Sequence, residues 1–519
     1  MVEQAASERP NKIKLVLVIL IACAAFSVYT NSFNGPFLFD DVVLVKDNPL
    51  IRDISNIPVF FKTDIFSHNP DAKPISNSYR PLQTATYAID FFLWGKGPMG
   101  FHLGNLLFHI INAILVFLLI ERLTRNRSLS FFVSLLFSIH PVNTQCVSYI
   151  AGRADLLVAL FVFLSFKFYI DYSKVKRAPL LFLSAISYLF ALYSKEAAMV
   201  ILPLILFLYN VTFNKTERFK IRSYLLHISM LAVYLPTRLH ALNGLAPRSL
   251  ELSKIELFPR VLTSLKGLFI DLRILLLPHD LHFGRTTEVE YSLFGTAGSV
   301  LTVLGLLIFV YILRSTYTKW DKKKDMGAGI IFFGFSWFFV SMLPLLNIIP
   351  LQVFHSDNWL YLSSIGIYLA AGHIIWHAWR ALDKRRIIFK YLIPLLVSAA
   401  LLLYGYATVK RNGDYGDEIR FYLSSLRWRP NVKFYRVVGG LYGEKGDYEN
   451  AVKHFKMGIE TDKIYPSPEE VTGVYYNLGI TYMRLSRFKE AEEALRKVLS
   501  SDNEALKKEA SRLLSRMKK

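Results

Sequence analysis

Long apolar segments recur along the chain and predict membrane-spanning helices. Runs such as residues 15–29, 103–120 and 391–407 contain no Lys, Arg, Asp or Glu. About 20 apolar residues at 1.5 Å per residue cross a hydrocarbon core of about 30 Å. No alternating, turn-separated pattern of a β-barrel occurs, so helices are the expected spanning elements. The first run has no small-residue cleavage site after it, and we expect it to be kept as an anchor. The pattern predicts an all-α, polytopic membrane protein.

One apolar segment, residues 260–277, breaks this pattern because it contains Lys266, Asp271 and Arg273. A charge at the bilayer centre costs a few kcal/mol even on lenient scales. A crossing there would also place the basic loop at 319–324 on the wrong side of the membrane. We therefore expect this segment to lie in the interface or to dip in and return, which leaves about eleven true spans.

Charge supports the membrane assignment and predicts its orientation. The chain has 519 residues, 53% of them hydrophobic, and a net charge of +21. Most of that excess lies in short loops, so it indicates topology rather than nucleic-acid binding. The basic loops lie near residues 12–14, 122–127, 174–177, 215–222, 319–324 and 384–390. The positive-inside rule places these loops and the N-terminus in the cytoplasm. The outer loops are then 34–100, 140–154, 194–197, 240–292 and 347–358, together with the tail after residue 411.

The tail contains two related segments. Aligning Tyr435 with Tyr475 superimposes Gly439 on Gly479, Tyr442 on Tyr482, Ala451 on Ala491 and Phe455 on Leu495. This is the tetratricopeptide spacing of small and large residues between paired helices, with repeats at about 431–464 and 471–504. We expect a membrane domain over 1–410 and an α-solenoid over 411–519, with a preceding helix in 414–428 and a capping helix in 503–517. Such repeats serve either as spacers or as grooves for an extended peptide.

Two adjacent carboxylates follow the first span, at Asp40 and Asp41 in "FNGPFLFDDVVLVKDNP". Like charges near an interface push one pKa upward, and a carboxylate in that state can act as a general base. A solvated loop or a helix cap would give the same pattern.

More ionisable and polar residues fall on the same predicted face, and convergence of this kind usually marks a site. Taken singly, each has a structural explanation, such as snorkelling, a helix start, an interface anchor or an Arg153–Asp155 ion pair. The candidates are Arg80, His102, His109, His140, Arg153, Asp155, Lys195, Glu196, His355, Asp357 and Tyr361.

A carboxylate pair with several cations at a lipid surface suits the transfer of a group from a lipid phosphate to a hydroxyl. The base deprotonates the acceptor, and a fixed Arg or Lys stabilises the charge that develops on the leaving phosphate. A long first loop and a re-entrant segment could hold this polar reaction beside the lipid.

Six motifs in order resemble the transmembrane and tetratricopeptide-repeat O-mannosyltransferase family. They are "FLFDDVVLVKDNPLIRD", "SYRPLQTATYAID", "FHLGNLLFHIINA", "HPVNTQCVSYIAGRADLL", "YSKEAAM" and "LYLSSIG", and repeats follow them. The likeness covers nearly the whole chain. It implies a GT-C fold, an inverting mechanism and a polyprenyl- or dolichyl-phosphate sugar donor used on the extracytoplasmic side.

The resemblance also implies roles for particular residues. Asp40, with Asp41 beside it, would supply the catalytic base. The donor or acceptor would be oriented by Arg80, His102 and Arg153, while Lys195 of the Lys195–Glu196 element would contact the donor phosphate. The family pattern usually has Arg where this chain has Asn358, Pro at Ser363, His at Asn143 and an acidic residue at Gln145. His355 or Arg285 could replace the lost cation.

The leading hypothesis is a membrane glycosyltransferase that moves a mannose-like hexose from a polyprenyl-phosphate carrier to a protein Ser or Thr on the periplasmic or lumenal side. If the source is bacterial, the membrane is the inner one. The expected partners are the lipid-linked sugar and an acceptor peptide held by the repeats, without nucleic acid. No cofactor is expected; the outer carboxylates could hold a divalent metal, but no spacing demands it.

Other hypotheses also fit the sequence. They are an oligosaccharyl or polysaccharide ligase that uses a diphosphate donor and a non-catalytic scaffold that recruits partners through its repeats. A transporter fits less well, because transporter sites usually lie near the midplane.

Overall fold

The structure is a computed structural model that describes residues 2–67, 78–242, 252, 254–285, 288–351, 353–383, 387–465 and 467–517. It contains two compact units. The first comprises residues 1–281 and 286–415, and the second comprises residues 282–285 and 416–519. The part that the structure describes contains helices and no strand.

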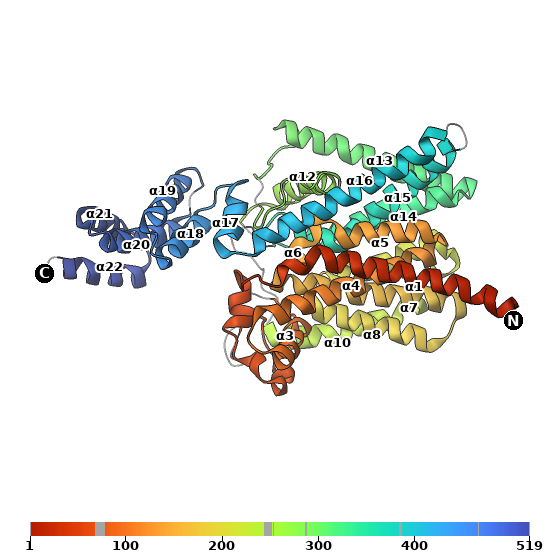
Figure 1. Ribbon diagram of the computed structural model, residues 1–519, viewed down its shortest axis with the longest axis horizontal. Coiled ribbons are helices and arrows are strands. Elements are labelled where there is room, and N and C mark those ends of the chain that lie inside the picture. The colour runs from red at the N-terminus through yellow and green to blue at the C-terminus, as the bar shows by residue number, and fades with distance from the viewer. Residues whose placement is uncertain are drawn as a thin grey trace. The chain divides into compact units, whose positions relative to one another are not determined.

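The first unit is a bundle of long helices (Figure 1). Its helices are α1 (Val2–Tyr29), α2 (Ile57–Phe60), α3 (Pro81–Trp94), α4 (Pro98–Thr124), α5 (Arg127–Ile139), α6 (Thr144–Val147), α7 (Arg153–Val175), α8 (Ala178–Ser194), α9 (Ala198–Phe213), α10 (Leu225–Leu242), α12 (Leu257–Leu276), α13 (Ala297–Lys323), α14 (Met326–Met342), α15 (Leu360–Asp383) and α16 (Ile387–Asn412).

Among the residues that the structure describes, seven helices of the first unit are long and apolar enough to cross a membrane. An eighth candidate is a bent pair, residues 141–147 and 150–175, whose halves meet at 99°. Three shorter apolar helices, α5, α8 and α9, raise the number of candidates to the eleven expected, and α12 is not among them. The predicted fold class, an all-α polytopic membrane protein, is confirmed.

Three helical hairpins turn in the same way. Arg125, Lys176 and Lys324 follow the last residues of α4, α7 and α13 and have φ values of 55°, 53° and 55°. One left-handed residue closes a helix by bonding its N–H to a carbonyl of the last turn, and the next helix begins two residues later in each case. A basic side chain at this position also faces the negative end of the helix dipole.

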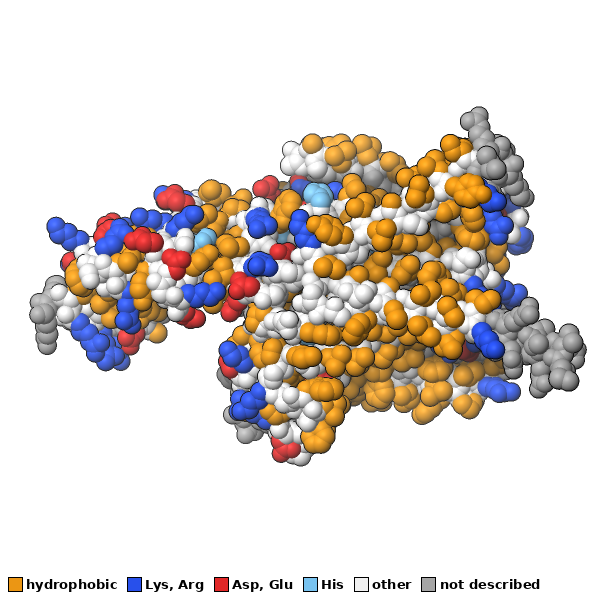
Figure 2. Space-filling view, viewed as in Figure 1, with side chains coloured by type: hydrophobic (Ala, Val, Ile, Leu, Met, Phe, Trp, Pro, Cys, Tyr) orange, Lys and Arg blue, Asp and Glu red, His pale blue; other side chains and the backbone are white. Residues whose placement is uncertain are grey.

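Contacts among the basic loops place several of them at one end of the bundle. Lys14 Nζ lies 2.6 Å from Glu121 of α4, and Arg122 lies 3.3 Å from Asp171 of α7. Lys176 in turn pairs with Glu217, which follows α9. Figure 2 shows blue side chains at this end, beside the N-terminus. The helices thus separate a basic end from the end where the candidate residues lie.

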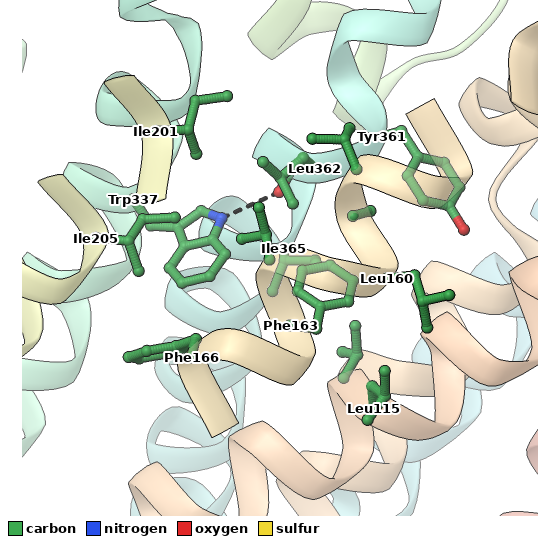
Figure 3. Packing of buried hydrophobic residues seen from close by; sticks show 14 of the residues in the cluster. Leu115, Leu160, Phe163, Phe166, Ile201, Ile205, Trp337, Tyr361, Leu362 and Ile365 are labelled. Carbon is green, nitrogen blue, oxygen red and sulfur yellow. Dashed lines mark hydrogen bonds between the residues drawn. The ribbon is translucent and has the colours of Figure 1, made fainter. Parts of the chain in front are cut away.

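The core of the first unit is packed between α4, α7, α9, α14 and α15 (Figure 3). Phe166 stacks on Phe333 with ring centroids 6.2 Å apart, and the Trp337 indole donates a 3.0 Å hydrogen bond to the Leu362 carbonyl. Gly334 and Gly366 let α14 and α15 approach so closely that a Cβ on Gly334 would lie 2.5 Å from the Gly366 carbonyl oxygen. Small residues of this kind allow close helix contact in membranes, where apolar burial alone drives little association.

The second unit contains α17 (Glu418–Leu426), α18 (Val432–Glu444), α19 (Tyr448–Ile464), α20 (Pro468–Arg484), α21 (Phe488–Leu499) and α22 (Glu504–Met517). The aligned positions of the two repeats are equivalent in space. Gly439 packs against the Phe455 ring, and a Cβ on Gly479 would lie 2.7 Å from Leu495 Cγ. Ala451 and Ala491 are both fully buried.

Residues 282–285 form part of the second unit although they come from the loop between α12 and α13. The Phe283 ring lies 4.9 Å from that of Phe421 and 6.3 Å from that of Phe434. The backbone N–H of Phe283 donates to Ser425 Oγ at 3.2 Å. Gly284 has a φ of +68°, and a Cβ there would lie 2.9 Å from Phe434, so this turn requires glycine.

Candidate active site

The acidic pair lies at a strained turn after α1. Phe39 has a φ of 45°, which is rare for a bulky residue, and Asp40 and Asp41 open a helical turn that continues as the π-helix Val42–Lys46. Left-handed backbone at such residues costs about 1–3 kcal/mol and persists only where the surroundings fix it. The hydrogen bonds of Asp41 hold the backbone of this turn in place.

Asp41 is fully buried and holds two backbone segments together. Its Oδ2 accepts from the Leu38 N–H at 3.0 Å, and its Oδ1 accepts from the Ala151 N–H at 2.7 Å. Burial raises the pKa of this carboxyl well above its ordinary value, and the neighbouring charge of Asp40 adds to that shift. The main cause is therefore desolvation, whereas the sequence suggested like-charge repulsion.

Asp40 differs from its neighbour because its side chain keeps part of its exposure. The backbone N–H of Asp40 donates to the Tyr149 hydroxyl at 3.0 Å. Tyr149 is itself buried. One phenol thus anchors the backbone at the acid pair.

Both anchors of the acid pair lie at the bend of the helix pair. Tyr149 lies in the break between the two halves, and Ala151 lies in the short 3-10 turn Ile150–Gly152 that begins the second half. Buried backbone N–H and C=O groups outside regular helix need other hydrogen-bond partners. Asn105 Nδ2 is one such partner, because it donates to the carbonyl oxygens of Tyr149 at 3.1 Å and Ile150 at 3.3 Å.

A second group links Asp155, Lys195 and Asn358. Lys195 Nζ lies 2.6 Å from Asp155 Oδ1, and Asn358 Nδ2 donates to Asp155 Oδ2 at 2.8 Å. The Lys195 side chain is 11% exposed. Asp155 pairs with this lysine, so the local Arg153–Asp155 ion pair is not formed.

The second group also contains two of the positions at which the sequence departs from the family pattern. Gln145 Nε2 lies 3.4 Å from Asn358 Oδ1. A neutral amide pair thus occupies the place where the resemblance predicts an acidic residue and an Arg.

Glu196 forms the centre of a third group. Its Oε1 accepts from the Tyr79 N–H at 3.0 Å and from Arg238 Nη1 at 3.3 Å, and its Oε2 lies 3.5 Å from Arg80 Nε. The Arg80 side chain is 20% exposed, which is more than that of Lys195 or Arg238. Among these three cations Arg80 is the most accessible.

Arg153 is fully buried, and its contacts are within the protein. Its Nη1 lies 2.5 Å from Asp90 Oδ2, its Nη2 donates to the Phe101 carbonyl at 2.7 Å, and its Nε donates to Asn105 at 2.7 Å. The guanidinium carbon lies 4.6 Å from the centroid of the Tyr87 ring. Through these contacts Arg153 holds α3, α4 and α7 together inside the bundle.

His102 and Asp357 are both buried close to Tyr415. His102 Nε2 is 3.1 Å from the Gly35 carbonyl oxygen, and a Cβ on Gly35 would lie 3.0 Å from the Tyr415 carbonyl oxygen. Asp357 is 3% exposed and interacts electrostatically with Arg411 and Tyr415.

The remaining candidates lie in other surroundings. His355 Nδ1 is 2.8 Å from Asp271 of α12. The Tyr361 hydroxyl is buried with His109 Nδ1 at 2.8 Å and Asn112 Nδ2 at 3.1 Å. Arg285 is buried as part of the second unit.

Sequence reasoning did not select Tyr149, Arg238 and Arg411. Arg238 lies near the end of α10, and a basic residue after an apolar run is typical of an ordinary membrane flank. Tyr149 stood inside a quoted motif, but nothing in its neighbours indicated that its hydroxyl faces the acid pair.

Known proteins share both parts of this chain. A tetratricopeptide repeat model matches residues 472–504. Human protein O-mannosyl-transferase TMTC3 is 24% identical over 528 residues, which cover 93% of this chain and 54% of the relative. The resemblance to this family is confirmed. The Caenorhabditis elegans protein O-mannosyl-transferase F38B6.6 is 24% identical over 464 residues, 86% of this chain and 63% of the relative.

Within the transmembrane and tetratricopeptide-repeat family, identity is higher over shorter alignments. Mouse protein O-mannosyl-transferase TMTC1 is 33% identical over 171 residues, 32% of this chain and 18% of the relative. The chain spans little more than half the length of the first relatives, human and mouse TMTC3. Among solved structures, the oligosaccharyltransferase of Archaeoglobus fulgidus tethered to an acceptor peptide matches with a TM-score of 0.44 and 13% identity. That match covers 84% of this chain and 58% of the other.

Proposed function

We propose that this protein is an integral membrane glycosyltransferase that moves a hexose from a polyprenyl-phosphate carrier to a hydroxyl of a protein, with inversion. The observation that carries the proposal is the difference in burial and contacts between Asp40 and Asp41. Asp41 is buried and holds the loop, while Asp40 is partly exposed beside it. A base must reach a substrate proton, so Asp40 is the catalytic member of the pair.

In the proposed reaction, the Asp40 carboxylate takes the proton of the acceptor hydroxyl. The acceptor oxygen then forms a bond to the anomeric carbon as the bond from that carbon to the phosphate oxygen breaks. The electron pair leaves with the phosphate, and a single displacement inverts the configuration. A nearby guanidinium or ammonium group stabilises the charge that develops on the leaving group.

Arg80 and Lys195 are the proposed cations for the donor phosphate. Each is held by a carboxylate, Arg80 by Glu196 and Lys195 by Asp155, and each retains some exposure. Side chains held in place in this way need little reorganisation when the charge develops. Arg153 would act from the interior by positioning α3, α4 and α7.

Sugar transfer from purified lipid carriers to acceptor peptides tests this proposal. Asp40→Asn should lower the rate by about 10²–10⁴-fold, the usual contribution of a general base. Asp47→Asn is the matched control, because Asp47 is an exposed carboxylate at the end of the same turn. Full activity of Asp40→Asn would contradict the base assignment.

A panel of carriers separates the competing reactions. Turnover with monophosphate carriers supports the proposal, whereas turnover with diphosphate carriers alone would indicate a ligase. A wild-type protein that turns over none of them would indicate a scaffold.

The repeats are proposed to present the acceptor. Deletion of residues 431–519 should then reduce protein modification more than it reduces carrier hydrolysis. Because Phe434 packs on Phe283, the deletion also disturbs the 282–285 segment, and Phe283→Ala in the full chain controls for that effect. An equal loss of both activities on deletion would contradict acceptor presentation.

A further inference from the structure

Helix α12 carries four charged residues, and three of them have a partner in the protein. Lys266 Nζ lies 2.5 Å from Glu290, and Arg273 Nη2 lies 2.7 Å from Asp280. Asp271 pairs with His355. Arg260 is the exception.

The Arg260 side chain is buried without a partner. The residue is 9% exposed, and its Nε and Nη1 are buried with no hydrogen-bond acceptor. Within the part of the chain that the structure describes, no carboxylate lies within ion-pair distance of it. A guanidinium group is always charged and offers five N–H donors, so burial without an acceptor is strongly unfavourable. This arrangement calls for an anion with several acceptor oxygens.

The start of α12 offers a second contribution to the same place. Arg260 is the fourth residue of the helix, and helical side chains lean toward the N-terminus, which directs this side chain back along the first turn. In the first turn the N–H groups of Leu257 and Phe258 have no acceptor inside the helix. Pro259 has no N–H, and the Arg260 N–H bonds to the Glu256 carbonyl at 3.3 Å. Glu256, at the N-cap, makes no side-chain capping bond, so it does not supply the missing acceptor. A helix start of this kind favours an anion, especially a phosphate.

The residues beside this helix start indicate what carries the anion. Leu257 and Phe258 each expose 52% of their surface. In a chain with several membrane-spanning helices, exposed apolar side chains next to a buried cation suit a ligand with a charged head and a hydrocarbon tail.

We propose that Arg260 and the first turn of α12 bind the phosphate group of a lipid. Arg260 supplies a planar fork of donors, and Leu257 and Phe258 contact the hydrocarbon chain. The site does not depend on sugar transfer, because it rests on α12 alone. The lipid is either an isoprenoid phosphate or a phospholipid of the bilayer, and both present the same phosphate oxygens.

Binding to the purified full-length protein tests the site. Isothermal titration calorimetry would use farnesyl phosphate, nanodiscs with and without phosphatidylglycerol, and inorganic phosphate. We expect Arg260→Gln to weaken binding of the phosphate lipid at least tenfold. Arg314→Gln, which removes the same charge from an exposed position on α13, should bind as the wild type does.

Each outcome decides the proposal. Arg260-dependent binding of farnesyl phosphate alone indicates an isoprenoid phosphate, and Arg260-dependent binding of both lipids indicates a bilayer lipid. Unchanged affinity in Arg260→Gln, or binding of inorganic phosphate as tight as that of the lipids, would overturn it. Should Arg260→Gln fail to fold, hydrogen exchange in the wild type decides, since bound lipid must slow exchange in residues 255–264. The same binding in Asp40→Asn separates this site from the proposed reaction.

Discussion

Asp41 and Ala151 are joined by a 2.7 Å hydrogen bond from the Ala151 backbone N–H to the Asp41 carboxylate. The bond ties the loop after α1 to the 3-10 turn that begins the second half of the bent helix pair. Asp41→Ala would leave this N–H and that of Leu38 buried without an acceptor, at a cost of about 1–3 kcal/mol for each donor. Thermal unfolding in detergent should show this loss for Asp41→Ala and little change for Asp40→Ala. Equal loss in both variants would contradict the separation of roles.

The pH dependence of stability should show the buried carboxyl. Because burial raises the pKa of Asp41, the native state holds its proton more tightly than the unfolded chain does. Its contribution to stability is complete below the ordinary pKa of about 3.9 and is lost as the pH rises through the native-state value. Thermal melts of Asp41→Asn across pH should therefore be flatter than those of the wild type.

Asp53 provides the opposite control for that experiment. Its carboxylate accepts from the Ser55 N–H, which lowers its pKa, so its contribution is lost as the pH falls. Asp53→Asn should leave the neutral and alkaline part of the melting profile unchanged. If the melting temperature of Asp41→Asn depends on pH as strongly as that of the wild type, the pH dependence comes from another group.

Arg153 and Asp90 form a buried ion pair, and removing one partner should be costly. Arg153→Met would leave Asp90 buried without its charge partner, which typically costs about 3–5 kcal/mol. Adding Asp90→Leu should recover much of that loss, because an apolar replacement of both partners is often neutral. Melting temperatures of the single and double variants measure this coupling. Without recovery in the double variant, the other Arg153 contacts carry the stability.

Gln145 and Asn358 are neighbours, so their substitutions should be coupled. Asn358→Arg alone would place a cation beside Lys195 and remove the amide that donates to Asp155. Gln145→Glu together with Asn358→Arg would supply the opposite charge. A double-mutant cycle on stability should give a favourable coupling of about 0.5–3 kcal/mol. Additive effects would show that the two positions do not interact.

The repeats offer a matched pair of adjacent glycines. A Cβ at Gly439 would overlap the Phe455 ring, whereas a Cβ at Gly440 meets nothing within 4 Å. We expect Gly439→Ala to destabilise by about 1–3 kcal/mol through overpacking. Gly440→Ala should be neutral or stabilise by up to about 1 kcal/mol, because alanine favours the helix. Hydrogen exchange in residues 432–464 measures both, and similar protection in the two variants would contradict the packing.

The sequence was sufficient to predict the spans, the basic loops and the repeats, because each depends on local patterns of apolar, charged and small residues. It also grouped Asp40, Arg80, Lys195 and Glu196 on one face. Pattern alone could not divide the roles of Asp40 and Asp41, since that division depends on two N–H groups, one of them from a loop far along the chain. Arg238 was missed for the same reason, because its partner, Glu196, lies in the turn between α8 and α9, far from Arg238 in sequence.

Residues 282–285 have a consequence for how the protein is made. The ribosome completes this segment long before residues 416–434, on which Phe283 packs, have been synthesised. The Phe283 side chain therefore lacks these packing partners while five further helices, α13 to α17, are synthesised. Contacts between residues so distant in sequence pay a large loop-closure entropy and form slowly. Capture of the segment should therefore be a late step in biogenesis, after the last membrane span has been inserted.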